Sequence, residues 1–138
     1  FSGHVLVAED IKTNQVLCTA LLTQMGLEVS IAEDGHEAVQ KALAGAFDLI
    51  LMDIHMPNMN GYEATKALRE KDVKVPIVAL TADAMKGDYN RCIEAGCDDH
   101  LAKPIDRREL AKTILKYLVP DRQAGIETVG STRTGAKS

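Results

Sequence analysis

The chain has 138 residues, of which 46% are apolar and 26% are charged, with a formal net charge of −4 at pH 7. This length accommodates one domain with a sizeable core. The negative charge and the lack of a basic stripe argue against general nucleic-acid binding. The sequence has no apolar stretch approaching ~18 residues and no recognisable signal peptide, so we expect no membrane contact of this segment.

Apolar runs and helical patterns alternate along the chain. Strands are predicted at residues 4–8, 28–32, 48–52, 77–80 and 99–102, and helices at residues 14–25, 36–44, 61–71, 84–95 and 107–118. This alternation is typical of βαβ units around a parallel sheet. The first, third and fourth strands are continuously apolar, as strands buried on both faces are. The second strand alternates instead, which predicts an edge position.

Glycines and polar residues mark the helix ends. Gly26, Gly45 and Gly96 follow helical patterns, and Asp106 is a predicted N-cap with Glu109 as its capping-box partner. After Pro120 the chain is rich in Gly, Ser and Thr and cannot bury enough apolar surface to fold alone. We therefore expect a folded domain over residues 1–120 and a flexible linker or tail over residues 121–138.

The first helix has two distinct predicted faces. The core side should carry Asn14, Leu17, Cys18, Leu21 and Met25, and the outer side Thr13, Val16, Ala20 and Thr23. The outer side has almost no charge, which favours a partner-binding face. Simple surface tolerance of small residues is the alternative. The cysteines at positions 18, 92 and 97 are spaced poorly for zinc and indicate a reducing, cytoplasmic setting, within a parent protein that could itself be membrane-anchored.

Polar residues stand at the ends of four predicted strands. Glu9 and Asp10 follow the first strand, Asp53 the third, Thr81 the fourth and Lys103 the fifth. The carboxyl ends of parallel strands meet at one sheet edge, where open α/β sheets bind ligands. Three carboxylates there suit Mg²⁺, which prefers oxygen ligands, and without a cation they would repel one another. One acid alone would be read as a loop cap, but three at equivalent positions favour a site.

Asp53 is the best candidate nucleophile of this group. A carboxylate can attack phosphorus to give an aspartyl phosphate. That chemistry depends mainly on positioning and charge neutralisation, which a cation, Lys103 and Thr81 could supply around the phosphoryl oxygens. The residues therefore predict phosphoryl transfer at this edge of the sheet.

From about residue 4 to residue 118 the chain resembles the receiver domain of two-component response regulators. The motifs that carry the resemblance are VLVAED (5–10), LMDIHMPNMNG (51–61), ALTA (79–82) and KP (103–104). The resemblance implies an α/β fold with a doubly wound five-stranded parallel sheet, in the flavodoxin-like order 2-1-3-4-5, and five helices. It also implies a cis bond between Lys103 and Pro104.

The resemblance further implies roles for six residues: Asp53 as phosphoacceptor, Asp10 as a direct Mg²⁺ ligand, Glu9 acting on the metal through water, His55 contributing its backbone carbonyl, Thr81 as the switch hydroxyl and Lys103 as the phosphate partner. One position departs from the family pattern, because His100 stands where a switchable aromatic residue is usual. It could make the switch pH-sensitive or could simply be a solvated surface side chain.

The sequences around residues 79–84 and 95–101 look like receivers fused to hybrid sensor histidine kinases. The implied partners are a histidine kinase or a histidine-phosphotransfer domain, with the receiver as a monomer or weak dimer. Such a domain catalyses its own aspartyl phosphorylation and dephosphorylation, in some cases within a histidine kinase. Stand-alone regulators and receivers from transcription factors remain alternatives, as does a phosphorylation-independent pseudo-receiver that acts as an interaction module. A hydrolase lacks support, because the chain has neither a G-x-S-x-G elbow nor a P-loop.

Overall fold

A five-stranded parallel sheet forms the centre of the structure, a computed structural model that describes residues 3–82 and 89–118. The strands are β1 (His4–Ala8), β2 (Glu28–Ala32), β3 (Leu49–Asp53), β4 (Ile77–Thr81) and β5 (Asp99–Ala102). Their order is β2-β1-β3-β4-β5, and each neighbouring pair is parallel. The expected topology and strand order are confirmed, including the edge position of β2.

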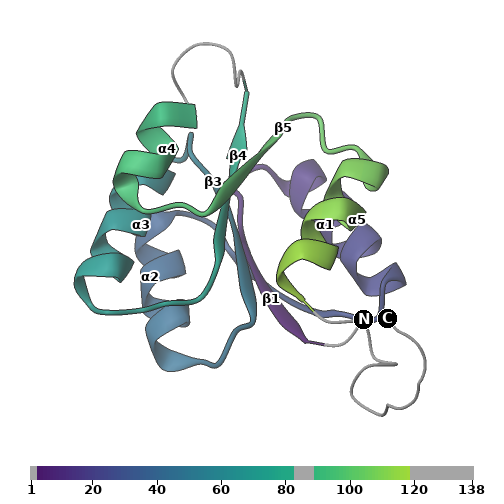
Figure 1. Cartoon of the computed structure of the whole chain (residues 1–138), viewed down its shortest axis with the longest axis horizontal. Coiled ribbons are helices and arrows are strands. Elements are labelled where there is room, and N and C mark those ends of the chain that lie inside the picture. The colour runs from purple at the N-terminus through teal and green to yellow at the C-terminus, as the bar shows by residue number, and fades with distance from the viewer. Residues whose placement is uncertain (1–2, 83–88, 119–138) are drawn as a thin grey trace.

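Helices cover both faces of the sheet (Figure 1). They are α1 (Lys12–Gln24), α2 (Gly35–Ala44), α3 (Gly61–Glu70), α4 (Tyr89–Ala95) and α5 (Arg107–Tyr117). One face carries α1 and α5, and the other carries α2, α3 and α4. Within the described residues no helix is long and apolar enough to cross a membrane. The first part of the predicted helix 84–95 and the predicted tail lie outside the described residues.

The apolar strands divide their side chains between two cores. In β1, Val5 and Val7 pack with the helices α1 and α5, whereas Leu6 and Ala8 pack with α2, α3 and α4. All four side chains are fully buried. Burial on both faces explains why β1, β3 and β4 read as continuous apolar runs. The sheet is thereby fixed in position, and with it the residues at its carboxyl edge.

Helix caps were predicted only in part. Asn60 caps α3 and exchanges hydrogen bonds with Glu63 in a complete capping box, which the sequence analysis did not identify. Asp106 caps α5 as expected and accepts a hydrogen bond from the backbone amide two residues on. Its expected box partner, Glu109, instead lies 3.6 Å from the ammonium of Lys112.

The core face predicted for α1 was wrong in part. Its buried side chains are Gln15, Cys18 and Leu22, whereas Leu17 is 41% exposed. The physical reason is a buried polar contact: the Gln15 side chain donates to the backbone oxygen of Glu9 at 2.6 Å, which turns this polar residue inward. The other residues expected on the core side, at positions 14, 21 and 25, are half-buried. The expected outer residues at positions 13, 16, 20 and 23 are indeed exposed.

Candidate functional site

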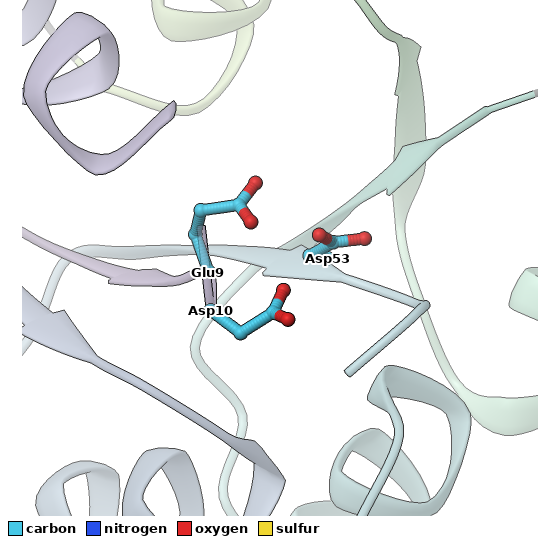
Figure 2. A group of neighbouring side chains, drawn as sticks. All are labelled: Glu9, Asp10 and Asp53. Carbon is cyan, nitrogen blue, oxygen red and sulfur yellow. The ribbon is translucent and has the colours of Figure 1, made fainter. Parts of the chain in front are cut away.

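Three carboxylates meet at the carboxyl edge of the sheet. Glu9 and Asp10 directly follow β1, and Asp53 is the last residue of the neighbouring strand β3. One oxygen from each side chain lies within 4.8 Å of the others. Figure 2 shows the three carboxylates turned toward a common space. The register of β1 and β3, in which Ala8 pairs with Met52, brings these acids together as the sequence predicted.

Lys103 places a positive charge between two of these acids. Its ammonium nitrogen donates to Asp53 Oδ2 at 2.8 Å and lies 3.1 Å from Glu9 Oε1. Burial alone would lower the pKa of Lys103, but the hydrogen bond and charge of Asp53, together with Glu9, outweigh it and raise the pKa above its ordinary value. Lys103 therefore remains charged at neutral pH. Its bond to Pro104 is cis, as the resemblance implied.

Glu9 is fully buried, and hydrogen bonds fix both its side chain and its backbone. Its Oε2 accepts a hydrogen bond from the backbone amide of Ile11 at 3.0 Å, and its backbone oxygen accepts one from Gln15. Its other carboxylate oxygen faces Lys103 without hydrogen-bond geometry to any described residue. That oxygen retains the capacity to accept a hydrogen bond. Asp10, by contrast, is exposed.

Asp53 is 1% exposed, and each of its oxygens has a donor. Oδ1 accepts a hydrogen bond from the His55 backbone amide at 3.0 Å, and Oδ2 accepts one from Lys103. Thr81 ends β4, one residue beyond the register partner of Asp53. It is fully buried, and its hydroxyl has no hydrogen-bond partner among the residues that the structure describes. Burying a polar group without a partner is costly, which makes this hydroxyl a candidate for contact with a bound group.

Sequence reasoning identified the charged residues but not the groups that position them. Gln15 and the backbone amides of Ile11 and His55 were missed. Gln15 was detectable in principle, because it stands three residues before Cys18 and seven before Leu22, on the buried stripe of α1. The backbone donors carry no sequence signal, since any residue type supplies the same amide.

The donor set fits a magnesium ion. Among the described residues, the cluster that could hold a metal consists of carboxylate oxygens, the donors that this hard cation prefers, without a nitrogen or sulfur ligand. Glu9 Oε1 is a buried acceptor with remaining hydrogen-bonding capacity, which suits contact with a metal-bound water. The acids thus meet the requirements of the expected ion.

His100, at the position where an aromatic residue was expected, lies in β5 and is half-buried. Its Nδ1 is 4.0 Å from Asp99 Oδ1, and its backbone amide donates to the same oxygen. Both alternatives for the role of His100 therefore stay predictions.

Comparison with known proteins decides the family. The model of the response regulator receiver domain matches residues 5–115, most of the chain. The chain belongs to this family. It is 43% identical over 119 residues to the sensor protein GacS of Pseudomonas syringae pv. syringae, a match that covers 83% of this chain but 13% of that protein. The chain thus spans about an eighth of the length of this curated relative.

Two solved structures extend the comparison. The receiver domain of the sensor histidine kinase PA1611 from Pseudomonas aeruginosa PAO1, with a magnesium ion in its active-site cleft, is 39% identical, with a TM-score of 0.78 over 85% of this chain and 98% of that one. The receiver of Ssk1 from Saccharomyces cerevisiae, solved with the histidine phosphotransfer protein Ypd1, is 32% identical, with a TM-score of 0.80 over 90% of this chain and 92% of the other. Both of these structures are receiver domains, in agreement with the family of this chain.

Proposed function

We propose that this receiver domain accepts a phosphoryl group from a phosphohistidine onto Asp53, in a Mg²⁺-dependent reaction. The single observation that carries the proposal is the environment of Asp53: a buried carboxylate whose Oδ2 accepts from Lys103 at 2.8 Å, within 4.8 Å of two further acids. Such clustered negative charge is costly in a fold that does not use it. The related PA1611 receiver, which has magnesium in its cleft, supports the choice of ion.

In the proposed reaction a carboxylate oxygen of Asp53 forms a bond to phosphorus while the bond from phosphorus to the donor imidazole nitrogen breaks. The His55 amide fixes the carboxylate by its hydrogen bond to Oδ1. Lys103 offsets charge on the transferred group, and the Thr81 hydroxyl is positioned at the neighbouring strand end to donate to a phosphoryl oxygen. Asp10, Asp53 and the His55 carbonyl would hold Mg²⁺, with Glu9 acting through water. When bound, the ion supplies charge neutralisation to the phosphoryl oxygens.

The donor proposed here is a histidine-phosphotransfer helix bundle or the corresponding domain of a histidine kinase. The exposed apolar side chains of Ile11, Val16 and Leu17 lie on and just before α1, immediately after the acids of β1. A cavity of about 340 Å³ adjoins Leu17 and is also lined by Cys18, Ile105 and Lys103 of the site. An apolar surface that runs up to the reacting residues suits a partner whose phosphohistidine must reach Asp53. The Ssk1 receiver solved with Ypd1 supports this class of partner.

Intact-mass measurement tests the proposed function. The chain is incubated with a small phosphodonor and Mg²⁺, and we expect one added phosphoryl group. Chelation of Mg²⁺ and the substitution Asp53→Asn should each abolish the added mass. A chain that takes no phosphoryl group from either a small donor or a phosphohistidine protein would instead be a pseudo-receiver, an interaction module without phosphorylation.

A further inference from the structure

We propose that Asp34 and Asn58, which lie outside the acid cluster, are positioning residues for the magnesium site. They form a bridge between the start of α2 and the β3–α3 connection, the segment that carries His55. The inference rests on the proposed function, because it concerns the loop whose amide holds Asp53 and whose carbonyl is a proposed metal ligand.

The two ends of this connection are tied to the sheet. The amide of Ile54 donates to the backbone oxygen of Leu80 at 3.3 Å, and the amide of Gly61 donates to the backbone oxygen of Ile54 at 3.2 Å. Gly61 packs so closely that a Cβ there would lie 2.4 Å from the backbone oxygen of Asp53. Between these ends, His55 stands at the site, and its position depends on what holds the middle of the loop.

The middle of the loop is held from α2. The side-chain amide of Asn58 donates to Asp34 Oδ2 at 2.9 Å, and the amide of Gly35 donates to the backbone oxygen of Met59 at 2.9 Å. The contact is tight, since a Cβ on Gly35 would lie 2.3 Å from that same oxygen. Asn58 adopts φ +68°, a conformation that Asn tolerates better than most residues. The loop therefore takes an unusual backbone shape that this bridge maintains.

Asp34 is itself fixed, so the bridge has a rigid base. Its Oδ1 accepts the backbone amide of Glu37 and caps α2, which packs on the sheet through the buried Ala38. Asp34 thus divides its two oxygens between a helix cap and the loop. Through Asn58, the position of α2 sets the position of the loop and hence of His55 relative to Asp53.

The substitution Asn58→Gly removes the bridge with little other change, because glycine adopts positive φ without strain. We expect it to weaken Mg²⁺ binding about tenfold, at the lower end of the effect of losing the outer partners of metal ligands. At saturating Mg²⁺ the rate of phosphoryl labelling should fall by a smaller factor than the Mg²⁺ affinity does. A general loss of stability would lower both quantities.

The exchanged pair, Asp34→Asn with Asn58→Asp, provides the rescue. The amide at position 34 can still cap α2 through its oxygen and can donate to the carboxylate at position 58, so the bridge is rebuilt in reverse with the net charge unchanged. We expect Mg²⁺ affinity to recover to within about twofold of the wild type. The matched control is Asp72→Gly, which changes the other described non-glycine residue with positive φ, in the connection between α3 and β4 at the opposite edge of the sheet.

Calorimetric titration of Mg²⁺ into the unphosphorylated chain measures affinity independently of phosphorylation. The inference predicts weak binding in Asn58→Gly, recovery in the exchanged pair and wild-type binding in Asp72→Gly. Wild-type binding in Asn58→Gly, or no recovery in the exchanged pair, would overturn the inference and leave Asp53 phosphorylation supported. If the wild-type chain binds Mg²⁺ but Asp53 is not labelled, the proposed function fails while the bridge is still tested by calorimetry. A wild-type chain that binds no Mg²⁺ would overturn both.

Discussion

At the scale of single residues, the site separates a buried acid from an exposed one. Glu9 is fully buried and has one oxygen taken by the Ile11 amide, whereas Asp10 is exposed beside it. The two acids are neighbours in sequence, yet they face different surroundings. This difference supports a direct metal contact by Asp10 and an outer role for Glu9.

The first prediction compares Asp10→Asn with Glu9→Gln, two substitutions that each remove one negative charge and preserve shape. We expect Asp10→Asn to weaken Mg²⁺ binding more, since loss of a ligand costs more than loss of an outer partner, whose effect is itself ~10–100-fold. Magnesium titrations of both variants measure the ranking. Equal or reversed losses would refute the assignment of the two acids.

The residues with charge were predictable, and the residues that hold them were not. Asp53 and Lys103, and the uncharged Thr81 with them, were found at predicted strand ends because parallel strands end at one edge of the sheet. The bridge between Asp34 and Asn58 joins residues 24 positions apart through side chains that are each common in turns. A local pattern cannot distinguish such a long-range contact from two independent turn residues.

At the scale of elements, β5 and α5 are joined by an ion pair. Lys116 of α5 lies 2.9 Å from Asp99 Oδ2, and the Tyr117 hydroxyl is 3.3 Å from the same oxygen. Burial alone would raise the pKa of Asp99, but these partners and the His100 amide outweigh it, so the pKa is lowered. The pair therefore contributes stability above the unfolded pKa of Asp, about 3.9, and loses it as the pH falls through the lower folded pKa.

The second prediction follows from the lowered pKa of Asp99. Lys116→Gln should lower the free energy of unfolding at neutral pH by about 0.5 kcal/mol, because Lys116 is largely exposed and screened by solvent. The difference from the wild type should shrink as the pH falls below about 4. Lys112→Gln is the control, since it removes the same charge from the same helix. The partner of Lys112 is the exposed Glu109, 3.6 Å away. Urea unfolding across the pH range measures both, and a difference that grows toward low pH would contradict the account.

Element positions followed from periodicity, but one helix orientation did not. The expected core face of α1 missed Gln15 because hydrophobic periodicity treats a polar residue as solvent-facing, whereas the Gln15 side chain donates to a backbone oxygen inside the fold. Similarly, Arg69 donates to the backbone oxygens of Gly96, Val73 and Val75. These hydrogen bonds join α3 to the α4–β5 connection and to the α3–β4 connection. Polar side chains used internally escape any prediction that equates polarity with exposure.

At the scale of the whole molecule, one side of the sheet carries exposed apolar side chains beside the site. The side of α1 and α5 exposes Ile11, Val16, Leu17 and Leu115, and the first three lie next to the acids that follow β1. The overall topology was predictable because strand and helix patterns alternate so regularly. The exposure of the outer face of α1 was predicted, although Leu17 belongs to that face rather than to the core.

The third prediction places the phosphohistidine partner on this surface. Val16 is 61% exposed, so Val16→Glu should leave folding intact. A charge buried at an interface without a partner is costly, and we expect transfer from a phosphohistidine protein to slow by about tenfold or more. Labelling by a small phosphodonor should be unchanged. Ile93→Glu, a matched change at an exposed residue of α4 on the opposite face of the sheet, should affect neither donor. Equal slowing with both donors would mean that the substitution damages the domain itself, whereas no slowing with either would exclude α1 as the docking surface.

The most direct test of the central claim is to locate the phosphoryl group chemically. Borohydride reduces an aspartyl phosphate to homoserine, which peptide mass spectrometry identifies by position. After treatment with a phosphodonor and Mg²⁺, we expect homoserine at position 53, and none when Mg²⁺ is chelated. Homoserine at position 10, or a phosphoryl group that Asp53→Asn retains in full, would contradict the account.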